Sequence, residues 1–399
     1  MTDAPILVVG AGQCGLKAVE TLRTGGYDGD LVFIGAEPHA PYQRPPLSKA
    51  FLKGEMSRDR LMLKPDRFFQ EKAIQTRFGE AVAAIAPERR EVTLAGGEHL
   101  AYSKLLLTTG TRARRVPLEG TDLAGVFHLR ELADVEWIAA NLDPSMRLAI
   151  VGAGYIGLEV AAALRVAGYN VTVLEGAERI LRRVVCPEVS AFFDGLHRDH
   201  GVDIRTSTLP SRIVGAERVE AIEFSDGNRL ACDAVLLAVG AEPVTDLAAA
   251  AGIGCENGIL VDTSCRTSAP DVFAAGDCAA FPSARYGRTI RLECVQNAID
   301  QGKAAAQAML GTPVAYDPLP WFWSDQYHVK LQIAGLSDGH TEIAIEGAPS
   351  DAGFAVTYLK EGVPVAVDAV NQPRAHMLAR RSLATPTAAE PAAAAAGTA

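Results

Sequence analysis

The sequence lacks the cysteine spacing that marks disulfide-stabilised domains and zinc sites. It has an odd number of cysteines, and no two of them form a C-x-x-C motif. We therefore expect neither a disulfide framework nor a metal site. The seven cysteines are Cys14, Cys186, Cys232, Cys255, Cys265, Cys278 and Cys294.

Long apolar runs and an excess of basic charge are also missing. No stretch approaches the roughly 20 apolar residues that cross a bilayer, and the N-terminus lacks the regions of a secretion signal. The formal net charge of −10 argues against nonspecific nucleic-acid binding. We expect a cytoplasmic protein that binds neither membrane nor nucleic acid, and its 399 residues predict two or three domains.

A glycine-rich turn occurs twice in this chain. Residues 9–18 read VGAGQCGLKA and residues 151–160 read VGAGYIGLEV, and each turn follows an apolar strand and opens a helix. In dinucleotide-binding folds the first glycine permits the turn, the second admits a pyrophosphate, and the third lets helix and strand pack closely. Tight strand–helix turns without a ligand are the alternative. The glycines are Gly10, Gly12 and Gly15 in the first copy, and Gly152, Gly154 and Gly157 in the second.

An acidic residue follows the second strand of each copy. Glu37 and Glu175 lie about 20 residues beyond their turns, where a carboxylate accepts hydrogen bonds from an adenosine ribose. Two bound dinucleotides are therefore predicted. Glu175 would repel a 2′-phosphate, which favours NADH over NADPH in the second site. Arg182 and Arg183 weaken that inference unless they are solvated surface residues.

Strand-like runs alternate with alanine-rich helical segments, which predicts mostly parallel α/β architecture. Each half also has a later apolar strand that ends in glycine. From Pro318 the pattern changes to alternating strands, and the alanine- and proline-rich segment from Ala384 is expected to be disordered. The predicted elements are the strands Ile6–Val9, Leu31–Gly35, Lys104–Thr109, Leu148–Val151, Asn170–Leu174, Ala234–Val239, Val329–Ile333 and Phe354–Tyr358, and the helices Cys14–Arg23 and Ile156–Ala167.

The segment FAAGD (273–277) indicates which nucleotide is bound first along the chain. Asp277 follows a short strand and a glycine, where it can hydrogen-bond the ribitol of FAD or cap a helix. With two dinucleotide turns upstream, the flavin interpretation is favoured.

These motifs together resemble the FAD-dependent ferredoxin reductase family, the NADH-using type that serves haem monooxygenases and aromatic-ring dioxygenases. The resemblance covers about residues 5–382. The matching motifs are GAGQCG (10–15), RPPLSK (44–49), TTG (108–110), GAGYIGLE (152–159), AVG (238–240), FAAGD (273–277), LECVQNA (292–298) and PWFWSDQY (320–327).

The resemblance implies two Rossmann-like dinucleotide-binding domains on the glutathione-reductase plan, plus an α+β C-terminal domain. Residues 1–113 and 243–317 would form a discontinuous FAD-binding domain, and residues 114–242 the NADH-binding domain. Residues 318–383 would form the C-terminal domain, followed by the disordered tail 384–399.

The resemblance also implies roles for individual residues. Lys49 would lie near flavin N5 and Glu159 near the nicotinamide, forming a pair that holds charge beside the flavin; by themselves they read as a surface lysine and a helix-face acid. Asp277 would bind the ribitol, and Trp323 would cover the flavin with Gln326 alongside. The other implied nucleotide contacts are Gly10, Gly12, Cys14, Gly15, Glu37, Arg44, Pro45, Ala81, Val82, Thr109, Gly110, Arg130, Gly154, Tyr155, Ile156, Glu175, Gly240, Gly276 and Val295.

Disulfide reductases of the same plan carry a cysteine pair soon after the first unit, and the segment YQRPPLSKAFLKG has none. The expected path therefore runs from NADH to FAD as a hydride, and from FAD as single electrons to an external [2Fe-2S] ferredoxin. A rubredoxin reductase, an NADH oxidase or peroxidase, and an NADH-sensing redox scaffold remain as alternatives.

The partner surface and the oligomeric state are less constrained. Basic residues that could dock an acidic ferredoxin are read equally well as scattered surface charges. His197 and His200 read as the end of a helix before Gly201 rather than as a metal pair. We expect a monomer or a weak homodimer. The candidate docking residues are His328, Lys330, Arg374, Arg380 and Arg381.

Overall fold

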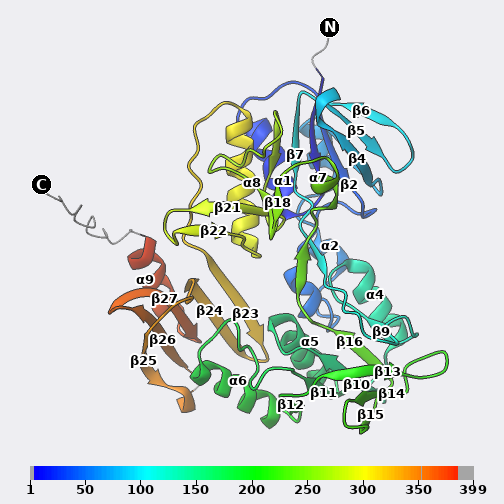
Figure 1. Cartoon of the computed structure of the whole chain (residues 1–399), viewed down its shortest axis with the longest axis vertical. Coiled ribbons are helices and arrows are strands. Elements are labelled where there is room, and N and C mark those ends of the chain that lie inside the picture. The colour runs from blue at the N-terminus through cyan, green and yellow to red at the C-terminus, as the bar shows by residue number, and fades with distance from the viewer. Residues whose placement is uncertain (1–3, 352, 385–399) are drawn as a thin grey trace, which may run out of the picture. The chain divides into compact units, whose positions relative to one another are not determined.

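The computed structural model describes residues 4–351 and 353–384, which divide into two compact units (Figure 1). The first unit runs to Asp317 and also takes in Phe322–Lys330. The second contains Pro318–Trp321 and the chain from Leu331 onward. The tail predicted to be disordered lies, beyond Ala384, outside the described residues.

A parallel five-stranded sheet forms the first half of the first unit. Its central strand is wholly buried, with Leu7 and Val8 fully inaccessible, as expected for a parallel sheet covered on both faces. The strand order is β20-β7-β1-β2-β3, so a strand from late in the chain completes a sheet built from the first 110 residues. The strands are β1 (Ile6–Val9), β2 (Leu31–Gly35), β3 (Ile74–Phe78), β7 (Lys104–Leu107) and β20 (Val272–Ala274).

Two helices from distant parts of the sequence pack together beside this sheet, α1 (Gln13–Thr24) and α8 (Val295–Met309). The approach is so close that a Cβ on Gly302 would lie 2.6 Å from the carbonyl oxygen of Cys14. Residues 295–309 are thereby held against the first glycine turn.

The second half of the first unit repeats this plan. Its parallel sheet has the strand order β12-β11-β10-β16-β9 (Figure 1). The helices of this half are α4 (Leu132–Asn141), α5 (Tyr155–Val166) and α6 (Pro187–Asp199). The strands are β9 (Val126–Phe127), β10 (Arg147–Val151), β11 (Asn170–Leu174), β12 (Asp203–Arg205) and β16 (Ala234–Leu237).

The duplication includes layers that the sequence patterns do not reveal. Each half adds a three-stranded antiparallel layer, which lies along the chain between β3 and β7 in the first half and between β12 and β16 in the second. In addition, β8 (Thr111–Ala113), which follows β7, and β17 (Ala241–Pro243), which follows β16, pair antiparallel with each other. The layers are β4 (Val82–Ala86), β5 (Glu91–Leu94) and β6 (His99–Ala101), and β13 (Pro210–Val214), β14 (Ala221–Phe224) and β15 (Arg229–Ala231).

Two predicted strands end earlier than expected. The strands predicted to reach Thr109 and Val239 end at Leu107 and Leu237. In the first case the Thr108 N–H still donates to the Val9 carbonyl oxygen at 2.7 Å, and the Thr108 hydroxyl donates to the Gly10 carbonyl oxygen at 2.8 Å, so this residue supports the glycine turn. The apolar pattern continues past this point and therefore overestimates the strand.

The second unit is an α+β domain. The antiparallel strands β24, β27, β26 and β25 lie in that order, and helix α9 packs on β27. A buried carboxyl group, that of Asp368, accepts a hydrogen bond from Tyr358 within this sheet. The elements are β23 (Trp321–Gln326), which carries the chain into the first unit, β24 (Val329–Gly335), β25 (Glu342–Ala348), β26 (Gly353–Lys360), β27 (Val363–Val370) and α9 (Pro373–Ala384).

Short elements complete the first unit, including a four-stranded sheet of order β18-β19-β21-β22. Across residues 4–351 and 353–384, every helix is too short or too polar to cross a membrane. The remaining elements are α2 (Arg58–Leu61), α3 (Asp66–Glu71), α7 (Asp246–Ala250), β18 (Cys255–Glu256), β19 (Gly258–Leu260), β21 (Ala279–Ser283) and β22 (Arg288–Ile290).

Candidate functional site

The first and third glycines of each turn are required by backbone geometry. Gly10 and Gly152 have φ values of 113° and 105°, in the region that side chains rarely adopt. A Cβ on Gly15 would lie 2.3 Å from the carbonyl oxygen of Gly10, and one on Gly157 would lie 2.1 Å from that of Gly152. These four glycines therefore build the turns, whatever the turns bind.

The second glycine of each turn, unlike the first and third, faces open space. A Cβ on Gly12 or on Gly154 would meet no atom within 4 Å. Each glycine is the N-cap of its helix, α1 or α5, and in the described residues no side chain caps either N-terminus. The first backbone N–H groups of each helix are thus available to an anion. Open space above uncapped N–H groups fits a pyrophosphate at both turns.

The two acidic residues expected at the ribose positions have different partners. Glu175 accepts hydrogen bonds from the backbone N–H of Ala153, at 2.8 Å, and from that of Ala177, at 2.9 Å. It therefore lies against the second glycine turn. Glu37 is instead paired with Arg44, 2.5 Å away, and accepts a hydrogen bond from Tyr42. The sequence predicted both acids but not this Arg44 pairing.

Lys49 and Glu159, more than 100 positions apart in the sequence, form a partly buried ion pair with Nζ and Oε2 2.5 Å apart. Lys49 follows the short 3₁₀ helix Pro45–Ser48, and Glu159 lies on α5 in the second half. The Glu159 carboxylate is only 5% exposed. It also accepts hydrogen bonds from Ser48 at 2.6 Å and from Ser324 at 2.7 Å. The pair therefore joins the two nucleotide-binding halves.

Asp277 lies among arginines from other parts of the first unit. Its carboxylate is 3.7 Å from the Arg130 guanidinium. Burial raises the pKa of Asp277 to about 6, although Arg130, Arg291 and Arg44 oppose the shift. Burial, reinforced by the nearby Arg44, lowers the pKa of Arg130. A carboxylate held beside these donors is suited to a polyol hydroxyl.

The other predicted contacts lie on the same unit. Gly276 is packed on Cys14, since its added Cβ would be 3.1 Å from Sγ. Ile156, at the start of α5, is 44% exposed beside the second turn, and the Tyr155 ring lies 4.7 Å from that of Phe322. The remaining positions also lie on this unit: Pro45 begins the 3₁₀ helix, Ala81 precedes β4 and Val82 begins it, Thr109 and Gly110 follow β7, Gly240 follows β16, Val295 begins α8 and Trp323 lies on β23.

The cysteines of this region are poor redox groups. All seven cysteines of the chain are free, and Cys14 and Cys278 are buried. Burial raises the pKa of both of these thiols, and it raises that of Cys265 and that of Cys294 to about 12. Since the thiolate is the reactive form, these residues are unsuited to nucleophilic or disulfide chemistry at neutral pH.

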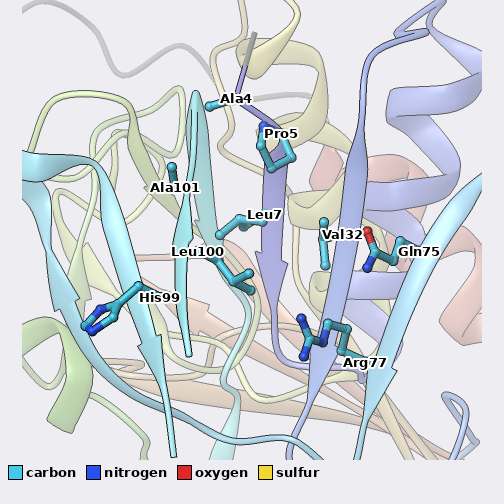
Figure 2. Close-up of a pocket in the computed structure, with 9 residues that line it drawn as sticks. All are labelled: Ala4, Pro5, Leu7, Val32, Gln75, Arg77, His99, Leu100 and Ala101. Atoms are coloured by element: carbon cyan, nitrogen blue, oxygen red, sulfur yellow. The ribbon is translucent and has the colours of Figure 1, made fainter. Parts of the chain in front are cut away.

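A cavity of about 400 Å³ lies elsewhere in the first half, between the parallel sheet and β6 (Figure 2). The charged side chain that lines it, that of Arg77, is already bound to Glu80 and Glu98. Of the nucleotide contacts predicted from the sequence, all of which the structure describes, none lines it. The lining residues are Ala4, Pro5, Leu7, Val32, Gln75, Arg77, His99, Leu100 and Ala101.

Sequence reasoning missed several residues around the ion pair. Ser48 and Ser324 bind Glu159 directly, and Tyr42 binds Glu37. Both serines lie inside motifs that carried the family resemblance, RPPLSK and PWFWSDQY. Their place in those motifs could have marked both serines as candidate site residues. The sequence does not indicate which side chain each serine contacts.

Comparison with known proteins agrees with this architecture. A family model described as pyridine nucleotide-disulphide oxidoreductase matches residues 4–302, and one described as reductase C-terminal matches residues 321–399. The chain belongs to the pyridine nucleotide-disulphide oxidoreductase family. It is an oxidoreductase, and its cofactors are FAD and NAD(H).

Similar proteins narrow the class further. The chain is 42% identical over 378 residues to the 5,5′-dehydrodivanillate O-demethylase ferredoxin reductase subunit of Sphingobium sp., covering 94% of this chain and 92% of that protein. It is 37% identical to the ferredoxin–NAD(+) reductase component of the biphenyl dioxygenase system of Paraburkholderia xenovorans, covering 95% and 93%. Its fold matches the reductase in the crystal structure of a covalent putidaredoxin reductase–putidaredoxin complex, with a TM-score of 0.93, 37% identity, and coverage of 97% and 94%.

Proposed function

We propose that this protein is the NADH-dependent reductase that supplies electrons to a [2Fe-2S] ferredoxin of an oxygenase system. The observation that carries the proposal is the Lys49–Glu159 pair, which links the first half of the first unit to α5, the helix that begins at the second glycine turn. Of the similar proteins described above, one is the reductase component of a dioxygenase system and one is the ferredoxin reductase subunit of an O-demethylase. The third was crystallised in a covalent complex with putidaredoxin. The terminal oxygenase would be a haem monooxygenase or a ring dioxygenase.

The residues present fit this chemistry. Bound FAD would supply a group that accepts two electrons as hydride and gives them up singly. The turn at Gly12 would hold its pyrophosphate and Asp277 its ribitol, while Gly154 and Glu175 would hold NADH. Lys49 would place a positive charge beside the flavin, and Glu159 would keep that charge fixed.

The surface that meets the ferredoxin is part of the proposal. Of the predicted docking residues, Arg380 lies over the Trp321 ring at 4.3 Å, and Lys330 is 3.4 Å from Asp325. Arg374 and Arg381 are exposed on α9. We favour these two arginines as contacts for an acidic partner.

Domain limits, oligomeric state and location are also proposed. Residues 1–113 with 243–317 would bind FAD, residues 114–242 would bind NADH, and residues 318–383 would form the C-terminal domain. The pairing of β20 with β7 supports the discontinuous FAD domain. Seven free thiols suit the reducing cytoplasm, and a monomer or weak homodimer is favoured.

Anaerobic stopped-flow mixing with NADH tests the function. We expect rapid bleaching of the flavin, followed by reoxidation only when a ferredoxin encoded in the same genome is added. Rapid reoxidation by oxygen alone would identify an oxidase, and reoxidation by a rubredoxin in place of ferredoxin a rubredoxin reductase. Slow bleaching with a persistent charge-transfer band would favour an NADH sensor.

A further inference from the structure

A row of buried polar side chains leads away from the ion pair. Ser324 donates to Glu159 Oε1 at 2.7 Å, and Gln326 Nε2 donates to Ser324 Oγ at 3.3 Å. His197 Nε2 lies 2.8 Å from Gln326 Oε1, and Tyr327 Oη lies 3.3 Å from His197 Nδ1. Ser324, Gln326 and His197 are each 0% exposed. The row joins the end of α6 to the carboxylate on α5.

The Gln326 amide oxygen can only accept a hydrogen bond, and this determines which atoms of the row carry a proton. An amide oxygen only accepts, so His197 Nε2 must carry a proton, and the neutral ring then accepts at Nδ1 from the Tyr327 hydroxyl. Burial lowers the pKa of His197 to about 4 and raises that of Tyr327 to about 12, so both are neutral near pH 7. Every donor from Tyr327 onward therefore points toward Glu159.

We propose, resting on the proposed function, that Ser324, Gln326 and His197 are positioning residues that fix the orientation of the Glu159 carboxylate toward Lys49. The Ser324 hydroxyl lies between the Glu159 carboxylate, which accepts its proton, and the Gln326 amide, which donates to its oxygen. Hydrogen bonds aligned in one direction strengthen one another, so each residue of the row helps to hold the next in place. Lys49 depends on that carboxylate to remain beside the nucleotide site.

Two charged or titratable groups near His197 act on its pKa in opposite directions. Asp194 on α6, which is bound to Arg198, raises this pKa, and His200, which directly follows α6 and stacks on Tyr327 at 3.7 Å, lowers it. From α5, Arg165 donates to the His200 carbonyl at 2.7 Å. The hydrogen-bond partners of the two imidazole nitrogens are Gln326 and Tyr327.

A substitution pair tests the proposal. Ser324→Ala should slow flavin reduction by NADH about tenfold, since the carboxylate that holds Lys49 loses one of its hydrogen bonds. Ser324→Thr keeps the hydroxyl and should restore the rate. Ser190→Ala is the matched control, because Ser190 is equally buried but donates to the Ile180 carbonyl at 2.6 Å. A wild-type rate of flavin reduction in Ser324→Ala would overturn the proposal.

A second measurement does not depend on activity. In protein carrying ¹⁵N-labelled histidine, the His197 signal, assigned by its loss in His197→Gln, should show the Nε2–H tautomer down to about pH 5. Gln326→Leu should abolish that preference. An Nδ1–H tautomer in the wild type would contradict the donor direction. If wild-type flavin is not reduced by NADH at all, the proposed function fails instead, which the first mixing experiment shows before any variant is made.

Discussion

The importance of Lys49 comes from its contact with a buried carboxylate and cannot be recognised from its neighbours in the sequence. It follows a proline turn, as many surface lysines do, yet its ammonium group contacts a carboxylate with 5% exposure. Removing one partner of a buried ion pair leaves the other charge uncompensated. The two side chains therefore depend on each other.

Lys49→Ala should slow flavin reduction by NADH at least tenfold while FAD remains bound, because the positive charge beside the nucleotide site is lost. Stopped-flow absorbance under anaerobic conditions measures this. Lys53→Ala is the control, since Lys53 lies four positions later and pairs with exposed Glu55. Wild-type rates in Lys49→Ala would remove this residue from the mechanism.

Glu175 should determine the choice between NADH and NADPH. Glu175→Ala is expected to lower the ratio of kcat/KM for NADH to that for NADPH about tenfold, because the carboxylate that repels a 2′-phosphate is gone. Glu175→Gln should behave similarly while keeping an acceptor for the Ala153 N–H. Steady-state kinetics with both nucleotides checks this, with exposed Glu220→Ala as control. An unchanged preference would show that Glu175 does not read the ribose.

At the level of elements, the two glycine turns differ in what they are expected to bind, although their geometry is the same. Gly12 and Gly154 both face open space, so alanine fits either turn without a clash. Gly12→Ala should yield folded protein with little FAD, because the methyl group occupies the pyrophosphate position. Gly154→Ala should retain FAD but raise the KM for NADH about tenfold. Flavin content and kinetics measure both, and the reverse pattern would exchange the two assignments.

The β27 strand carries a titrating group that should control the stability of its sheet. Burial raises the pKa of Asp368 to about 7, so the folded state favours the neutral acid. Stability is therefore greatest below about pH 4 and falls as the pH rises toward 7, by up to about 4 kcal/mol. Asp368→Asn should remove this dependence and raise the unfolding temperature at pH 8. Glu346→Gln on exposed β25 should change nothing; an equal gain from both would indicate a general charge effect.

The elements also show what sequence can and cannot provide. Strands such as Ile6–Val9 and helices opened by Gly12 and Gly154 were predicted within a residue or two, because local apolar runs and glycine turns specify them. The Glu159–Ser324 and Glu37–Arg44 contacts were not predicted. Glu159 and Ser324 are 165 positions apart, so their proximity depends on the tertiary fold. Glu37 and Arg44 are seven positions apart and meet through an irregular loop, whose conformation no periodic pattern specifies.

In the first unit as a whole, one parallel sheet combines strands from two separate parts of the chain. β20 (Val272–Ala274) pairs with β7, so the sheet behind the first turn is complete only when chain from both sides of the second half assembles. Gly12 and Asp277 belong to these two separate segments. A ligand held by both should therefore stabilise both together, by about 4 kcal/mol when free FAD exceeds its Kd a thousandfold.

Hydrogen exchange with mass spectrometry tests this coupling. Stripping FAD should increase exchange in β1 and in β20 together, while β10 (Arg147–Val151) in the other half stays protected. Adding FAD should reverse the change, and NAD⁺ should instead protect β10 and the start of α5. A change confined to residues before 114 would show that Asp277 does not contribute to binding, and an effect on β10 equal to that on β1 would show that the two halves do not respond to their nucleotides separately.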